Sequence, residues 1–293
     1  MIDPFTAVWL VTGCSSGFGK AIAAQLAAVG TKVVATARNT DTLGYLPDNT
    51  PHVAKAVLDV TDPDGIAAAV AMATARFGRL DIVVNNAGIG VIGPVEDVTP
   101  EQTRLQFDVN VHGMFNVIRA TAPLFREQRS GLYINFASMA GEVSIDSLGV
   151  YSASKFAVEG LSEALRAEMK PYGVDVMIVE PGPFDTEWLG KNAIWGPRDE
   201  ARYPAVWRYV EMMKDVYADR NQVGDPARAA EAIIDAAGWS PPPERLPLGE
   251  ASLGATRSKI AALQSNLDRV EPLARSMHYT ASPHRSATMG RTT

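Results

Sequence analysis

Short apolar stretches alternate with alanine-rich stretches of helical length from residue 7 to about residue 180 of the 293-residue chain. Most of the apolar stretches are continuous, as they are in strands buried on both faces of a parallel sheet. The alternation predicts βαβ units, and therefore an α/β fold with one doubly wound parallel sheet and helices on both of its faces. The expected strands cover residues 7–12, 32–37, 53–58, 80–85, 131–137 and 174–180.

Capping residues mark where several helices should begin. Asp62 and Asp225 are each followed by proline, which suits the first helical position. Residues 99–102 read Thr-Pro-Glu-Gln, a capping box, and predict one long helix that continues past Asn110. Residues 187–224 contain no clear strand, so we expect an excursion from the sheet there.

The chain is expected to form a single large domain over residues 7–250, because its length suits one well-buried core. A last short strand is expected at residues 245–248. Residues 255–277 have a helical pattern and belong to an expected C-terminal helical extension over residues 251–278. Residues 279–293 are rich in serine, threonine and histidine, and they are expected to be disordered.

The charge balance and the cysteine content argue against several classes of protein. The net charge of −6 and the pI near 5.3 disfavour nucleic acid binding. No apolar run reaches the roughly 18 residues that a membrane span needs, and the N-terminus does not resemble a secretory signal. Cys14 is the only cysteine, and the four histidines lack the spacing of a zinc site. We therefore expect a cytoplasmic protein that binds no nucleic acid, membrane or metal.

A glycine-rich segment follows the first expected strand and leads directly into a helix, which is the setting of a phosphate-binding turn. Gly13 allows the tight turn, and Gly17 lets backbone N–H groups approach a pyrophosphate. Gly19 lets the helix pack close to the strand. A plain turn rich in glycine and serine is the alternative interpretation.

The spacing of these glycines, G-x-x-x-G-x-G, resembles that of the short-chain dehydrogenase/reductase family. Residues 85–88 read Asn-Asn-Ala-Gly after the fourth expected strand and match a second motif of that family. The resemblance implies a Rossmann-type fold that binds a nicotinamide dinucleotide. It implies cofactor contacts from Gly13, Ser15, Ser16, Gly17, Phe18, Gly19, Arg38, Asp59, Val60, Asn86, Ala87, Gly88, Tyr151, Lys155, Pro181, Gly182 and Thr186.

The residues after the second expected strand bear on the choice between NADP(H) and NAD(H). An acidic residue there would bind the adenosine 2′-hydroxyl and repel a 2′-phosphate. The chain instead has Arg38, whose planar guanidinium suits a phosphate, so NADP(H) is favoured over NAD(H). A solvated surface cation is the alternative interpretation of Arg38. The resemblance also implies that Asp59 contacts the adenine amine, although Asp59 by itself could be a simple turn residue.

A tyrosine and a lysine four residues apart follow Ser138, which ends the fifth expected strand. On a helix, Tyr151 and Lys155 share one face. Proton transfer to or from an alcohol needs an acid/base group near neutral pH, whereas free tyrosine has a pKa of about 10. We expect the buried ammonium of Lys155 to lower the pKa of Tyr151 by about two to three units.

The family resemblance implies further roles around this pair. Ser138 would hydrogen-bond the substrate oxygen, and Lys155 would also hold the nicotinamide ribose. Asn110 matches a catalytic position that holds a water on a proton relay behind Lys155, and Thr186 would bond the nicotinamide carboxamide. Two plainer interpretations stay open: a helix-interior Asn110 satisfied by backbone groups, and a simple turn at residues 181–182.

The resemblance predicts an oxidoreductase that moves hydride between NADP(H) and a secondary alcohol or ketone, with Tyr151 as the general acid/base. A non-enzymatic NADPH-binding sensor or interaction protein on the same fold is the alternative, because a fold does not determine a function. Steroid or retinoid dehydrogenases and acyl-thioester ketoreductases are further possibilities among enzymes. The C-terminal extension leaves the choice between a homodimer and a homotetramer open.

Aromatic and sulfur-containing side chains gather in the excursion at residues 187–224, which we expect to act as a substrate lid. Such a lid could close over a bulky, apolar substrate and expel water. Ordinary core packing on amphipathic helices explains the same composition equally well. The side chains concerned are Trp188, Trp195, Trp207, Tyr203, Tyr209, Tyr217, Met212 and Met213.

Overall fold

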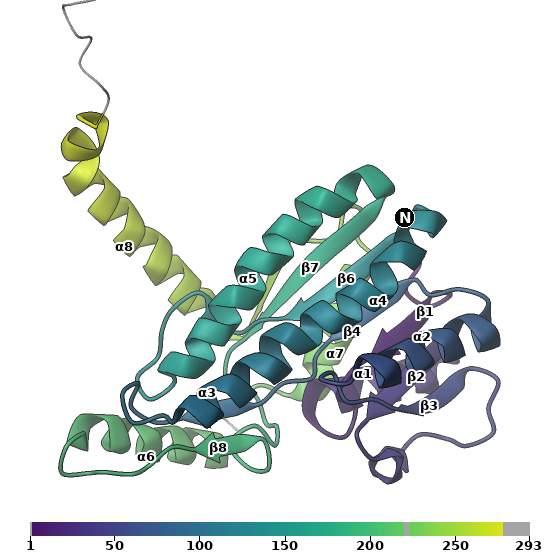
Figure 1. The fold of residues 1–293 in the computed structure, drawn as a ribbon, viewed down its shortest axis with the longest axis horizontal. Coiled ribbons are helices and arrows are strands. Elements are labelled where there is room, and N and C mark those ends of the chain that lie inside the picture. Colours follow the sequence, from purple (N-terminus) through teal and green to yellow (C-terminus); the bar gives the residue numbers. More distant parts are fainter. Residues whose placement is uncertain (1, 220–222, 278–293) are drawn as a thin grey trace, which may run out of the picture.

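The structure is a computed structural model that describes residues 2–219 and 223–277. Seven strands form one parallel sheet in the order β3-β2-β1-β4-β6-β7-β9 (Figure 1). The sheet confirms the predicted α/β fold, and each predicted strand is found to within two residues at either end. The strands are β1 (Val8–Val11), β2 (Lys32–Ala37), β3 (Val53–Val57), β4 (Ile82–Asn85), β6 (Gly131–Phe136), β7 (Val174–Pro181) and β9 (Arg245–Leu248).

Helices cover both faces of this sheet, so the domain has three layers. One apolar core lies between the sheet and α1 and α7, and the other lies between the sheet and α2, α4 and α5. Strand order reverses between β1 and β4, which is where parallel α/β sheets open a crevice at the carboxyl ends of their strands. The covering helices are α1 (Gly17–Ala28), α2 (Pro63–Phe77), α4 (Gly113–Gln128), α5 (Gly149–Met169) and α7 (Pro226–Ala237).

The predicted helix starts are confirmed by their capping hydrogen bonds. The Asp62 carboxylate accepts from the backbone N–H of Asp64 at 3.1 Å, and α2 ends at Gly78 with a left-handed φ of 82°. Thr99 and Gln102 form both hydrogen bonds of the capping box at the start of α3 (Pro100–Phe107).

The long helix predicted to continue past Asn110 is interrupted. A π-helical turn, η2 (Asp108–His112), separates α3 from α4 and places Asn110 on its inner side, where the residue is buried. π-Helical turns are rare and often mark functional sites. A capping box marks only where a helix begins, so it does not reveal such a turn further along the chain.

Two short strands were missed by the sequence analysis. β8 (Ala193–Trp195) pairs in parallel with β5 (Gly90–Ile92), so the expectation of no strand in residues 187–224 is wrong. Each strand has three residues, which is too short to show an alternating pattern. The pair ties the excursion to the loop that follows β4.

Two helices extend the basic fold. α6 (Pro204–Ala218) lies within the excursion, and α8 (Glu250–Arg275) begins five residues earlier than the predicted helix. Figure 1 shows α8 pointing away from the body of the molecule. The expected disordered tail at residues 279–293 lies outside the described residues. Within the ranges that the structure describes, no helix combines the length and apolar character that crossing a membrane requires.

Candidate functional site

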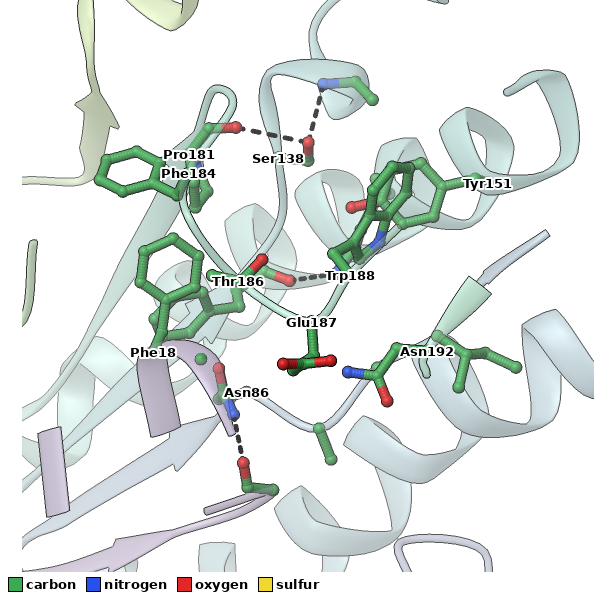
Figure 2. Close-up of a pocket in the computed structure, with 18 of the residues that line it drawn as sticks. Phe18, Asn86, Ser138, Tyr151, Pro181, Phe184, Thr186, Glu187, Trp188 and Asn192 are labelled. Atoms are coloured by element: carbon green, nitrogen blue, oxygen red, sulfur yellow. Dashed lines mark hydrogen bonds between the residues drawn. The ribbon is translucent and has the colours of Figure 1, made fainter. Parts of the chain in front are cut away.

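A cavity of about 530 Å³ opens at the carboxyl edge of the sheet, where the strand order reverses. Figure 2 shows how side chains from several loops converge on it. All but two of the predicted site residues line this cavity. The exceptions are Gly19, which lies under the glycine-rich loop, and Asn110, which lies behind Lys155.

The glycine-rich loop has the backbone conformation that its sequence predicts. Gly13 and Gly17 adopt left-handed φ values of 72° and 55°, which disfavour other residues. A Cβ atom at Gly19 would come within 2.5 Å of the Gly13 carbonyl oxygen and of the Asn86 amide. The loop therefore packs tightly against the Asn-Asn-Ala-Gly segment, and only glycine fits at Gly19.

Thr12 and Asn86 hold these two loops together. The Thr12 hydroxyl accepts from the backbone N–H groups of Asn86 at 2.9 Å and Ala87 at 3.1 Å. In return, the Asn86 amide donates to the carbonyl oxygens of Thr12 at 2.8 Å and Gly13 at 3.1 Å. The side chain of Asn86 thus shapes the end of the cavity that the glycine-rich loop forms.

The rim at the far end of this loop carries the charged pair Arg38 and Asp59. Arg38 is exposed and lines the cavity. Burial acts to raise the pKa of Asp59, but two hydrogen bonds from Thr61 and the charge of Arg38 outweigh it and lower the pKa. Asp59 is therefore ionised at neutral pH and already forms a turn with Thr61 through Oδ1, at 2.9 and 2.7 Å.

Ser138, Tyr151 and Lys155 meet at the other end of the cavity. The Ser138 hydroxyl accepts from the backbone N–H of Ala140 at 3.1 Å and donates to the carbonyl oxygen of Pro181 at 3.5 Å. Lys155 Nζ lies 5.8 Å from the centroid of the Tyr151 ring. Both side chains are buried on one face of α5, as their spacing predicts.

The predicted lowering of the Tyr151 pKa is wrong for this structure. Burial raises the pKa of Tyr151 to about 12, and the interaction with Ser138 offsets only part of that rise. Burial also lowers the pKa of Lys155 to about 8, while the charge of Glu159 acts in the opposite direction. Lys155 Nζ donates to the Phe136 carbonyl oxygen at 2.7 Å. Desolvation, which the spacing does not reveal, therefore outweighs the attraction between phenolate and ammonium.

Asn110 is held by the backbone of Ile89, as the plainer interpretation expects, and its amide also donates to the Ser154 hydroxyl at 3.2 Å. Its amide oxygen accepts from the backbone N–H of Ile89 at 2.9 Å, and its amide nitrogen donates to the Ile89 carbonyl at 3.0 Å. Asn110 and Lys155 also line a second, internal cavity of about 10 Å³, which is close to the space that one water molecule needs. Asn85 also lines that cavity, and its buried Oδ1 has no hydrogen-bond partner among the described residues.

The aromatic residues of the excursion divide between lining the cavity and filling the core. The Trp188 ring lies 5.1 Å from the Tyr151 ring and 6.3 Å from the Tyr217 ring, centroid to centroid, and Figure 2 shows the first pair. By contrast, Trp207 is buried in the apolar cluster against which Trp188 and Tyr209 pack, and it is not among the residues that line the cavity. Trp188, Tyr209, Met212, Met213 and Tyr217 line the cavity.

Sequence reasoning missed a partly buried cluster of charges that follows Tyr151 and Lys155 along α5. A single guanidinium nitrogen of Arg245 contacts the carboxylates of Glu142, Glu159 and Glu180, the last two at 2.6 Å. The second terminal nitrogen of Arg245 contacts Glu163 at 2.5 Å. Arg245 thereby joins the wall of the cavity, α5, and the strand that leads into the Pro181–Gly182 turn.

Two carboxylates of this cluster, those of Glu159 and Glu180, have raised pKa values. Burial raises the pKa of Glu159 to about 8, helped by the charge of Glu180 and opposed by Arg245. Burial also raises the pKa of Glu180. The sequence signal that could have revealed this cluster is the spacing of Glu159 and Glu163, which continue the four-residue intervals of Tyr151 and Lys155 along the helix.

The chain is similar in sequence to a family of dehydrogenases and to known oxidoreductases. The sequence model described as short chain dehydrogenase matches residues 7–195. The oxidoreductase BOA17 of Botryotinia fuckeliana is 32% identical over 246 residues, which cover 83% of this chain and 89% of that protein. The 3-ketodihydrosphingosine reductase of Bacteroides thetaiotaomicron is 41% identical over 185 residues, covering 63% of this chain and 66% of that protein.

Solved structures are similar over almost the whole chain. A short-chain dehydrogenase from Streptomyces avermitilis has a TM-score of 0.85 and 37% identity, covering 93% of this chain and all of that one. One from Burkholderia cenocepacia in complex with NADP has a TM-score of 0.71 and 26% identity, covering 92% and 99%. One from Burkholderia phymatum in complex with NAD has a TM-score of 0.73 and 26% identity, covering 90% and 97%.

Proposed function

The chain belongs to the short chain dehydrogenase family of oxidoreductases, and on that premise we propose that it reduces a bulky, apolar ketone with NADPH, or oxidises the matching secondary alcohol with NADP. One observation carries the proposal. A single cavity has a glycine-rich phosphate-binding loop at one end and Ser138, Tyr151 and Lys155 at the other. A dinucleotide that lies along it would bring its nicotinamide to the acid/base group.

The residues at the loop end fit the diphosphate of such a cofactor. Gly13 and Gly17 leave the backbone uncovered, and α1 begins at Gly17 with its positive end toward the loop. Within the described chain, Ser16 caps α1 without a side-chain hydrogen bond, and the first turn has no acidic residue. The backbone N–H groups at the start of α1 are therefore free to hold the diphosphate anion.

The nicotinamide, when bound in its reduced form, supplies the hydride. Tyr151 supplies the proton that the substrate oxygen needs as it becomes an alcohol. The raised pKa of Tyr151 keeps its phenol protonated at neutral pH, which is the state that a proton donor requires. The protonation state therefore favours reduction of a ketone over oxidation of an alcohol.

Lys155 and Ser138 support this proton transfer. With a pKa of about 8, Lys155 is mainly charged at neutral pH, and its ammonium stabilises the phenolate that Tyr151 becomes. Ser138 is buried at the edge of the cavity with its hydroxyl directed by Ala140, so it can donate to the substrate oxygen. Both roles agree with those that the family resemblance implies.

The internal cavity between Asn110 and Lys155 provides a route for the replacement proton. A water in that cavity would have polar neighbours in Asn85, Asn110 and Lys155. Because Asn110 is fixed by its two hydrogen bonds to Ile89, its part is to shape the cavity. We propose that, after Tyr151 has given its proton to the substrate oxygen, Lys155 passes a proton to the phenolate and regains one from solvent through this water.

Arg38 supports NADP(H) as the preferred cofactor over NAD(H). Its exposed guanidinium lies at the cavity rim beside Asp59, where it can reach a 2′-phosphate. The related structures include complexes with NADP and with NAD, so the preference rests on Arg38 alone.

The apolar wall formed by the excursion favours a bulky, apolar substrate. Trp188, Met212, Met213 and Tyr217 face the cavity from residues 187–224, and Ile145 and Leu148 face it from the loop after β6. A segment that contributes this much apolar surface above the reacting groups can exclude water from them. We propose that residues 187–224 form the substrate lid.

The test is NADPH consumption at 340 nm across a panel of aliphatic, steroid-like and acyl-thioester ketones. The proposal expects turnover with the bulky apolar members and NADPH preferred to NADH, with the preference lost in Arg38→Ala. Cofactor binding should be measured separately by NADPH fluorescence. Tight NADPH binding without turnover of any ketone or alcohol would overturn the proposal and favour a cofactor-sensing protein.

A further inference from the structure

We propose that α8 is a dimerisation helix, and that two copies of the chain pair through it side by side in antiparallel orientation. The inference is independent of the proposed reaction, because it depends only on residues 253–277. It begins from the side chains that α8 leaves uncovered.

One stripe of α8 has the spacing of a coiled coil. Apolar or small residues recur at alternating intervals of three and four, which places them along one side of a slightly underwound helix. The only hydroxyl among them, on Thr256, donates to the carbonyl oxygen of Ser252 at 3.1 Å. The stripe consists of Leu253, Thr256, Ile260, Leu263, Leu267, Val270, Ala274 and Met277, of which Met277 lies two residues beyond the end of the helix.

Most of this stripe is exposed in the single chain. The exposed fractions are 62% for Ile260, 51% for Leu263, 59% for Leu267 and 69% for Met277. Figure 1 shows that α8 leaves the body of the molecule after its first turns. Ser252 is buried there, and its hydroxyl donates to the Glu180 carbonyl at 2.7 Å. An isolated helix in water is only marginally stable, so a projecting helix with an apolar stripe needs a partner surface.

The face of α8 opposite the stripe is too polar to form the dimer contact in its place. The positions opposite the stripe carry small or polar residues and one proline, which therefore lies on the outer side. They are Ser258, Ala261, Ala262, Ser265, Asp268, Arg269, Pro272, Arg275 and Ser276. Apart from Leu273, which is 67% exposed on one flank, the large apolar side chains follow one seam, as in a two-stranded coiled coil rather than in a helix buried on all sides.

The stripe matches a second copy of itself when the second helix runs in the opposite direction. If Leu253 lies opposite the partner's Met277, then Ile260 lies opposite the partner's Val270. The same register sets Leu263 opposite the partner's Leu267. This register pairs every position of the stripe, over roughly three and a half heptads, which is enough for a stable coiled coil. Two-fold symmetry then repeats each contact.

Charges beside the stripe select the same register. Arg257, Gln264 and Glu271 follow one another at seven-residue intervals along one flank. In the antiparallel register above, Arg257 lies across from the partner's Glu271, and symmetry forms this pair twice. In a parallel pair, this flank would instead face Lys259 and Asn266 of the other copy. Arg257 and Glu271 would then have no oppositely charged residue across from them. Glu271 now pairs with Arg275 of its own helix at 2.5 Å, an exposed contact that costs little to exchange.

The first test is the mass in solution, by light scattering after size exclusion. The account expects wild type to have twice the chain mass of 31.4 kDa. Leu263→Lys places a charge in the stripe and should give a monomer. The matched control Ser265→Lys adds the same charge to the outer side of the same helix and should stay dimeric. Circular dichroism and NADPH binding check that both variants are folded. A monomeric wild type, or a dimer that survives Leu263→Lys, would overturn the proposal.

The second test addresses the register. Arg257→Glu should weaken the dimer at least several-fold in sedimentation equilibrium, because it sets like charges opposite each other. Adding Glu271→Arg should restore most of the affinity. If the double variant is weaker than both single variants, the antiparallel register is wrong. Cosedimentation of a monomeric wild type with vesicles of phosphatidylglycerol and phosphatidylcholine would instead assign the stripe to a membrane surface and refute the proposal.

Discussion

Two polar regions follow each other along α5 and differ in how their charges are satisfied. The first consists of Tyr151 and Lys155 and faces the cavity. The second consists of Glu159 and Glu163, one and two turns further along, which contact Arg245 at 2.6 and 2.5 Å. One helix thus carries a sparse pair of titratable groups next to a dense ionic cluster.

The contrast shows that burial alone does not make a residue reactive. Desolvation shifts the pKa of Lys155 and of Glu159 to about 8 in both regions. In the second region the carboxylates are held by Arg245, so they cannot reach a substrate in the cavity. In the first region, the phenol of Tyr151 borders the cavity, where a reacting group can approach. Access to the cavity distinguishes the proposed chemistry from the structural cluster.

Removing the phenolic oxygen should have the largest effect on the first region. We expect Tyr151→Phe to lower kcat/KM for ketone reduction by roughly 10² to 10⁴, the usual contribution of a general acid. NADPH affinity should stay close to that of wild type. Glu163→Gln is the matched control on the same helix and should retain activity. Equal losses in both variants would show that the helix, and not the phenol, was disturbed.

Removing the central cation should have the largest effect on the second region. Arg245→Met leaves the Glu180 carboxylate buried without a counter-ion and removes the hydrogen-bond partner of Glu159, so it should lower the free energy of unfolding by about 3–5 kcal/mol. Urea unfolding at pH 7 measures this change. Glu163→Gln removes a partner that is more than half exposed, so it should cost less than about 1 kcal/mol. Similar costs for the two variants would contradict the assigned roles.

The pH dependence of stability should show a smaller effect from Glu159. The pKa of Glu159 in the folded state is about 8, above the ordinary value of 4.5. Between pH 4.5 and pH 8, the folded protein therefore holds a proton on Glu159 that the unfolded protein has lost. The contribution of Glu159 to stability is complete below about pH 4.5 and is lost as the pH rises toward 8. The slope is at most about 1.4 kcal/mol per pH unit. Glu159→Gln should flatten unfolding curves between pH 5 and 8, and an unchanged slope would show that Glu159 does not bind this proton.

The positions and conformation of the glycine-rich loop could be predicted because their signals are local. Gly13, Gly17 and Gly19 are constrained by one turn, and Asn86 follows a strand that the apolar pattern locates. The Tyr151–Lys155 pair is equally local, since one helical turn sets its spacing. Each of these positions depends on a few neighbouring residues.

The rest of the site depends on residues that are far apart in the chain. Arg245 meets Glu163 from 82 positions away, and no local pattern connects them. β8 pairs with β5 from about 100 residues away, over only three residues each. The pKa of Tyr151 was predicted in the wrong direction because spacing reveals a nearby charge but not the loss of water around both groups.

The central claim is that a protonated Tyr151 beside a charged Lys155 drives ketone reduction. The most direct test is kcat/KM for NADPH-dependent reduction of an accepted ketone, measured from pH 6 to pH 10. The account predicts a plateau below about pH 8 and a decline above it, as Lys155 loses its proton while Tyr151 keeps its own. A rate that rises through this range would mean that the ionised phenol is the active form, and it would contradict the account.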